Sequence, residues 1–216
     1  MNFFKTVDGR ITEVSEFTEG CWVNMVHPSS DELEQIAQAA QVEEEFVRAA
    51  LDPEESSRVD TEDEQLLMIV DIPMVEKSSV EDGGQMFTTI PMGIVVAQNA
   101  VITVCLEDSI ILRSIAEGAV KGVHTSLKTR FVFQILLRIA GRFLKNLRMI
   151  ERDFTRIEKR LYDSLKNEEL IQLLGLSKSL VTSPRPSRAT RLRWKRCCAA
   201  ACSSCTRTTA TFWRTR

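Results

Sequence analysis

The stretch GGQMFTTIPMGIVVAQNAVITVCL, residues 83–106, decides the fold, because its 24 residues carry no charge. A run of this length could cross a bilayer as one helix. Its composition favours sheet instead, since it contains Pro91, three Thr and three Gly, and its Val and Ile residues gather in two short segments. These segments, 94–96 and 101–104, flank Gln98-Asn99, a pair suited to a hairpin turn. The sequence therefore predicts a β-hairpin here and no membrane-spanning helix in the chain.

Further strands are expected on the N-terminal side of this hairpin. Residues 10–15 and 21–26 have strand-like patterns around a Thr-Glu-Gly turn, and residues 58–60 look extended and polar. The continuous apolar run at 66–70 has strand length and is closed by Asp-Ile-Pro at 71–73. We interpret that run as a central strand, because both of its faces must be buried.

Short helices are expected between the strands. Ser29-x-x-Glu32 forms a capping box, in which the hydroxyl and the carboxylate satisfy free N–H groups of the first helical turn. The residues that follow place four apolar side chains at helical spacing: Leu33, Ile36, Ala37 and Ala40. Further short helices are predicted over 43–51 and 109–117. Together these patterns predict an α/β domain over 1–125, with a mixed sheet flanked by helices.

The pattern changes from about Ser126 onward to a long amphipathic helix. Its apolar residues recur at near-heptad spacing: Ile139, Phe143, Leu147, Ile150, Phe154, Ile157, Leu161 and Leu165. This spacing predicts packing along another long helix, as in antiparallel or coiled-coil-like pairs. A second helix is predicted from about 167–169 to Val181. We therefore expect a helical region over 126–181.

Composition gives no sign of an enzyme. The chain is 44% hydrophobic and 27% charged, so it can build a core. Cys21 and Cys105 lie in apolar runs and are expected to be buried free thiols in a reducing compartment. The first residues have no apolar secretory segment. Because no Ser/His/Asp arrangement, phosphate loop or pair of catalytic carboxylates stands out, we predict no catalytic residues.

The last 35 residues, 182–216, differ from the rest of the chain. They hold eight Arg, one Lys and no acidic residue, so the tail is +9 and the preceding body −11. The favoured explanation is a frameshift after Val181, because restoring one lost base permits an acidic, helix-forming continuation; we expect the tail as printed to be disordered. Two other readings stay open. Cys202-x-x-Cys205 beside Cys197-Cys198 could bind zinc, and the Arg-rich strip could bind nucleic acid or an anionic membrane, although no nucleic-acid partner is expected.

Four segments are informative together: WVNMVHPSSDEL (22–33), LDPEESSRVD (51–60), LLMIVDIP (66–73) and NEELIQLLGLSKSLV (167–181). They resemble the cytosolic domain of CorA-type magnesium transporters. Their order and spacing make the match fairly specific, although no segment suffices alone. The resemblance implies an α/β domain on the cytoplasmic side that feeds a long helix into two membrane spans, assembled as a pentamer in the cell membrane.

The resemblance also implies regulatory Mg²⁺ bound by carboxylates between neighbouring subunits. Mg²⁺ prefers oxygen ligands and keeps several waters, so one or two carboxylates per subunit suffice. Glu81 and Asp82, in the loop before the hairpin, are the candidate ligands, with a solvated acidic turn as the competing interpretation. The family's Gly-Met-Asn pore signature does not occur in these 216 residues. We therefore expect the regulatory domain of a divalent-cation transporter that moves no ions by itself; the alternative is a soluble protein-interaction module.

Overall fold

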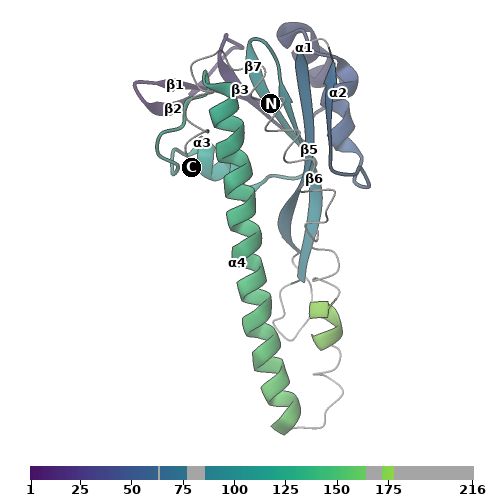
Figure 1. Ribbon diagram of the computed structural model, residues 1–216. Helices are drawn as coiled ribbons and strands as arrows, with labels where there is room; N and C mark the ends of the chain where they lie inside the picture. The colour runs from purple at the N-terminus through teal and green to yellow at the C-terminus, as the bar shows by residue number, and fades with distance from the viewer. Residues whose placement is uncertain (63, 77–85, 164–171, 178–216) are drawn as a thin grey trace, which may run out of the picture.

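The computed structural model describes residues 1–62, 64–76, 86–163 and 172–177 (Figure 1). Seven strands form one sheet in the order β2-β1-β3-β7-β6-β5-β4. Their bounds are β1 Asn2–Val7, β2 Arg10–Val14, β3 Cys21–Val26, β4 Arg58–Glu62, β5 Gln65–Glu76, β6 Met86–Val96 and β7 Ala100–Cys105. Strands β3 and β7 are parallel, and every other described pair is antiparallel, so the sheet is mixed as expected.

Helices cover both faces of the sheet. The α-helices are α1 Ser30–Ala40, α2 Glu44–Arg48, α3 Ile110–Ala116 and α4 Lys128–Asp163, and a 3-10 turn, η1, covers Ala49–Leu51. One core packs α1, α2 and η1 onto one sheet face, and a second core packs α3 and the first half of α4 onto the other. Alternation along the strands builds both cores: Trp22 points into the α4 core, whereas its neighbours Cys21 and Val23 point into the α1 core.

The uncharged stretch forms the predicted hairpin of β6 and β7, with Gln98 and Asn99 in the turn. All six side chains of β7 are buried, because this strand lies at the centre of the sheet. The prediction that 66–70 is a central strand is confirmed, because this run of β5 lies inside the sheet, with β4 on one side and β6 on the other.

Strand β5 also continues past the Asp-Ile-Pro segment that was expected to close it. Pairing of β4 with β5 ends at Arg58 opposite Ile69, so Pro73 lies where β5 has β6 as its single described neighbour. Pro91 of β6 similarly lies one residue before the pairing with β7 begins at Met92. A proline is tolerated at such places, because its missing N–H can face the side without a partner strand. Beyond these points β5 and β6 form a two-stranded arm that extends to Glu76 and Met86.

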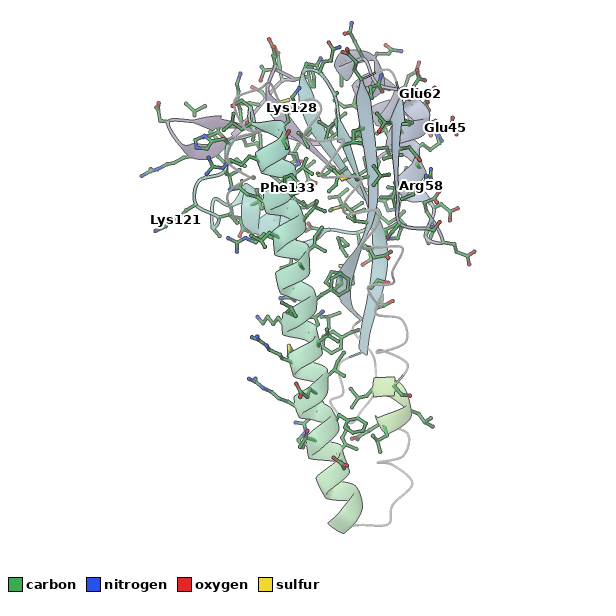
Figure 2. The ribbon with its side chains drawn as sticks, viewed as in Figure 1. Glu45, Arg58, Glu62, Lys121, Lys128 and Phe133 are labelled. Carbon is green, nitrogen blue, oxygen red and sulfur yellow. The ribbon has the colours of Figure 1, made fainter. Side chains whose placement is uncertain are left out.

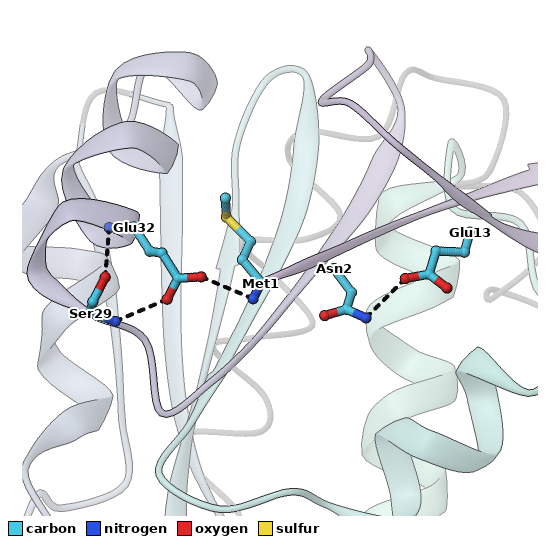
Figure 3. A network of polar contacts seen from close by, with 5 residues as sticks. All are labelled: Met1, Asn2, Glu13, Ser29 and Glu32. Carbon is cyan, nitrogen blue, oxygen red and sulfur yellow. Dashed lines mark hydrogen bonds and ion pairs between the residues drawn. The ribbon is translucent and has the colours of Figure 1, made fainter.

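The predicted capping box of α1 is confirmed and has an additional partner (Figure 3). The Ser29 hydroxyl accepts from the Glu32 N–H at 3.3 Å, and Glu32 Oε2 accepts from the Ser29 N–H at 3.0 Å. Glu32 Oε1 also binds the N-terminal ammonium of Met1 at 3.1 Å. The Ser29 N–H, followed by this ammonium, lowers the pKa of Glu32. This ion pair links the first residue of the chain to α1. Strand β1, which directly follows Met1, was not predicted in the sequence analysis.

Helix α4 confirms the long amphipathic helix, but the described partners of its apolar stripe are not another long helix. Phe131, Ile135 and Ile139 pack on the sheet, and farther along Ile150 and Ile157 pack with residues of the β5–β6 arm and of the segment 172–177. That segment is helical and falls within the second predicted helix. Near-heptad spacing specifies an apolar stripe and not its partner, and the sheet supplies most of the partner surface here.

Candidate functional site

The predicted metal ligands Glu81 and Asp82 lie outside the described residues, so the proposed Mg²⁺ site stays a prediction. By chain order they belong to the segment that joins β5 to β6. Within the described part of the chain, no group of three or more His, Cys, Asp or Glu side chains is close enough to hold a metal ion. The features that the structure does define lie along α4: its attachment to the sheet, its contact with the β5–β6 arm, and its charge.

The attachment of α4 centres on Trp22, a fully buried residue of β3. The Trp22 ring contacts the edge of Phe131 in the first turn of α4 at a centroid distance of 5.4 Å, and Phe4 of β1 on another side at 4.9 Å. Its indole N–H donates to Thr103 Oγ1 of β7 at 2.8 Å, so the polar end of the ring is satisfied inside the core. Three neighbouring strands and α4 thus meet at one side chain.

Two polar contacts fix where α4 begins. The Lys128 ammonium donates to the carbonyl oxygens of Ala97 and Gln98, at 2.9 and 2.7 Å, in the turn between β6 and β7. Just before the helix, the Thr125 hydroxyl accepts from the Thr6 N–H, and the Thr6 hydroxyl accepts from the Thr125 N–H, both at 3.1 Å. A cation at a helix N-terminus opposes the helix dipole, so the position of Lys128 reflects these carbonyl contacts. The sequence analysis missed them, because a lone Lys gives no signal of its partner.

The second half of α4 faces the β5–β6 arm across a small hollow. Its lining is mostly apolar and consists of Pro73, Phe87, Thr88, Thr89, Phe143, Asn146, Leu147 and Ile150. Asn146 is the exception, because its side chain is 96% buried (4% exposed) and neither amide atom has a hydrogen-bond partner in the described structure. An unpaired buried amide weakens the packing around it. The contact between α4 and the arm therefore contains a polar weak point.

The predicted free thiols are confirmed, since Cys21 and Cys105 are both buried and unpaired with each other. Burial, assisted by the charge of Asp108, raises the pKa of the Cys105 thiol to about 12. Burial also raises the pKa of Cys21. Neither thiol is poised to react or to bind a metal ion, because both chemistries need the thiolate.

A family model described as CorA-like Mg²⁺ transporter protein matches residues 18–199 of this chain. This chain belongs to the CorA-like Mg²⁺ transporter family. The match extends 18 residues beyond Val181 into the basic tail, which lies outside the described residues. The family is one of transporters and not of enzymes.

A characterised relative agrees with this assignment. The cobalt/magnesium transport protein CorA of Methanocaldococcus jannaschii is 24% identical over 185 residues, which cover 81% of this chain and 54% of that protein. This CorA-like chain thus spans about half the length of that relative. No helix of the described residues is both long and apolar enough to span a membrane.

Solved structures show the same fold. The soluble domain of CorA from Methanocaldococcus jannaschii superposes with a TM-score of 0.71 at 17% identity, covering 93% of this chain and 88% of that chain. The complete structure of the same transporter gives a TM-score of 0.69 at 16% identity, covering 94% and 69%. The cytoplasmic domain of ZntB from Vibrio parahaemolyticus gives 0.62 at 16% identity, covering 93% and 86%.

Proposed function

We propose that this chain is the cytosolic regulatory domain of a CorA-like divalent-cation transporter, placed on the cytoplasmic side of the cell membrane. The observation that carries the proposal is the family match, which covers strands β3 to β7, α4 and the helical segment beyond it. In this role the domain catalyses no reaction. It senses a divalent cation, Mg²⁺ by the family resemblance, within a homo-oligomer that the same resemblance makes a pentamer.

Helix α4 is suited to relay the state of the domain over a distance. It is continuous over 36 residues, which corresponds to a length of roughly 54 Å. Its first turns are held by the Trp22–Phe131 contact and by Lys128, whereas its far end extends beyond the sheet and the β5–β6 arm (Figure 1). A helix held firmly at one end moves at the other end when the sheet around its base rearranges.

The proposed sensor is the acidic pair Glu81 and Asp82 in the β5–β6 connection. Mg²⁺ bound there stabilises the assembled, folded state in proportion to its occupancy. Added Mg²⁺ at millimolar concentration is therefore expected to raise the resistance of the chain to limited proteolysis and to favour oligomers. Absence of any Mg²⁺ effect on the unaltered chain would count against ion sensing by this domain.

Matched variants identify the residues involved. Glu81→Ala/Asp82→Ala should weaken the Mg²⁺ dependence, whereas Glu16→Ala/Glu19→Ala should leave it unchanged. The control removes the same charge from two exposed acidic residues before β3. An unchanged response in the first variant would remove Glu81 and Asp82 from the site and leave the family assignment intact.

A further inference from the structure

The hollow between α4 and the β5–β6 arm combines an apolar lining with one unpaired amide. Asn146 lines the hollow, is 4% exposed, and has no partner for either its Oδ1 or its Nδ2 atom in the described structure. Two other described amides, Asn99 and Gln134, have a buried unpaired oxygen, but each donates a hydrogen bond through its amide nitrogen. Among the described residues, Asn146 is therefore the buried amide that keeps both a free donor and a free acceptor.

The energetic cost of this arrangement points to a ligand. A buried amide without partners lowers the stability of the fold, whereas a leucine of similar size at the same place would not. Folded proteins pair nearly all of their buried polar groups, and exceptions are expected at functional sites. The lining around Asn146 contains no charged side chain, and most of it is apolar: Pro73, Phe87, Phe143, Leu147 and Ile150.

The two walls of the hollow belong to different parts of the fold. One wall is the middle of α4, and the other is the arm, which supplies Pro73 from β5 and residues 87–89 from β6. The hollow lies beyond the base of α4, where Lys128 and Phe133 are labelled in Figure 2, in the part of the helix whose side chains point towards the arm. Leu147 is 39% exposed, so one side of the lining is in contact with solvent. A ligand bound here contacts both walls.

The size of the hollow and the two free atoms of Asn146 define the chemistry of that ligand. The hollow encloses about 250 Å³ of empty space, its open mouth included. Sites for drug-sized ligands are larger, roughly 300–1,000 Å³, so this one accommodates a single functional group on a short apolar body. That group must accept a hydrogen bond from Nδ2 and donate one to Oδ1.

A primary carboxamide meets both requirements from one edge, because its N–H and its C=O lie side by side. A trans peptide group does not, because its N–H and C=O point in opposite directions. A carboxylate has no proton to donate, and its charge would lose its hydration within an apolar lining.

We propose that this hollow binds a neutral carboxamide on a short apolar body, the chemistry of an asparagine or glutamine side chain or of a small aliphatic amide. Two N–H···O hydrogen bonds join the ligand to the Asn146 amide, and its apolar part lies against the apolar lining. Binding stabilises the contact between α4 and the arm in proportion to occupancy. The inference does not rest on ion sensing, and it holds whether or not Glu81 and Asp82 bind Mg²⁺.

Propionamide is the probe, and propionate, which has the same shape but a carboxylate, is the comparison. Heteronuclear NMR of the full chain titrated with propionamide should show saturable shifts at residues 143–150, Thr88 and Thr89. The dissociation constant should be roughly millimolar, as expected for a ligand of about five non-hydrogen atoms. Propionate at equal ionic strength should bind about tenfold more weakly or not at all. Amide hydrogen exchange over residues 143–150 should slow with propionamide and not with propionate.

Matched variants locate the binding. Asn146→Leu should abolish the saturable shifts, whereas Gln38→Leu should leave them unchanged, because Gln38 is an exposed amide of α1, which packs on the other face of the sheet. The comparison of propionamide with propionate uses the unaltered chain, so it remains decisive if a variant fails to fold. Shifts that do not saturate, equal binding of propionate, or an unchanged titration of Asn146→Leu would each overturn the proposal. So would an ordered water molecule at Asn146 that propionamide does not displace.

A glutamine-containing tripeptide and its glutamate counterpart separate the two sources of the carboxamide. Both sources require that the glutamine peptide binds more tightly than the glutamate peptide. Binding of the glutamine peptide tighter than that of propionamide assigns the site to a side chain of a partner polypeptide, and weaker binding assigns it to a small amide. Equal affinities of the two peptides would contradict recognition of the carboxamide.

Discussion

Asn146→Leu is expected to stabilise the contact between α4 and the β5–β6 arm. Asn146 is 4% exposed, and neither of its amide atoms has a partner in the described structure. An amide buried without hydrogen bonds costs about 1–3 kcal/mol, and the leucine adds apolar contact while the adjoining hollow limits overpacking. The free energy of unfolding should therefore rise by about 1–2 kcal/mol.

Urea unfolding followed by tryptophan fluorescence measures the global change, and amide hydrogen exchange over residues 143–157 of α4 locates it. The matched control is Asn24→Leu in β3. Asn24 Oδ1 accepts from the Thr103 hydroxyl at 3.1 Å, so its loss should lower the free energy of unfolding by about 1 kcal/mol. If Asn146→Leu also lowers that free energy by about 1 kcal/mol or more, the amide has a partner and the inferred weak point does not exist.

Two further predictions concern the core that anchors α4. Thr103→Val should lower the free energy of unfolding by about 1–3 kcal/mol, because it leaves the buried Trp22 N–H unpaired. Thr103→Ser keeps the hydroxyl, so its free energy of unfolding should fall less in the same urea titration. Equal losses of stability in the two variants would refute the role of the hydrogen bond. Stability should also fall as the pH rises from 9.0 towards 12, because an unfolded Cys105 thiol loses its proton in that range while the folded one, with a pKa of about 12, retains it. Comparing the pH dependence of unfolding with that of Cys105→Ala isolates this contribution, and identical slopes would contradict it.

Local sequence patterns were sufficient where neighbouring residues determine the structure. The capping box at Ser29 and Glu32, the buried stripe of α1, and the β6–β7 hairpin all formed as predicted. Helix caps and tight turns depend on contacts within a few residues, so they can be read from the chain. The buried state of Cys21 and Cys105 was equally predictable from their apolar surroundings.

Strand order could not be read in this way. The run at 66–70 has the composition of a central strand and has a partner strand on each side, but it did not show that β5 continues beyond the end of β4. The local sequence does not distinguish a strand that is paired on both sides along its whole length from one that is paired on both sides along only half of it. The prolines at 73 and 91 carried that information, since each marks where one neighbouring strand ends.

The sequence by itself determined the family, the α/β class, the long helix and the opposite net charges of that helix and of residues 1–127. Only the tertiary structure decided which surfaces carry the charge. It turned one face of α4 towards the sheet, which left Arg138, Lys145 and Arg152 exposed, and it placed Glu45 and Glu62 on the opposite flank. The physical reason is that amphipathic spacing indicates which side chains of a helix are buried, whereas the surface that buries them depends on contacts between residues far apart in the chain.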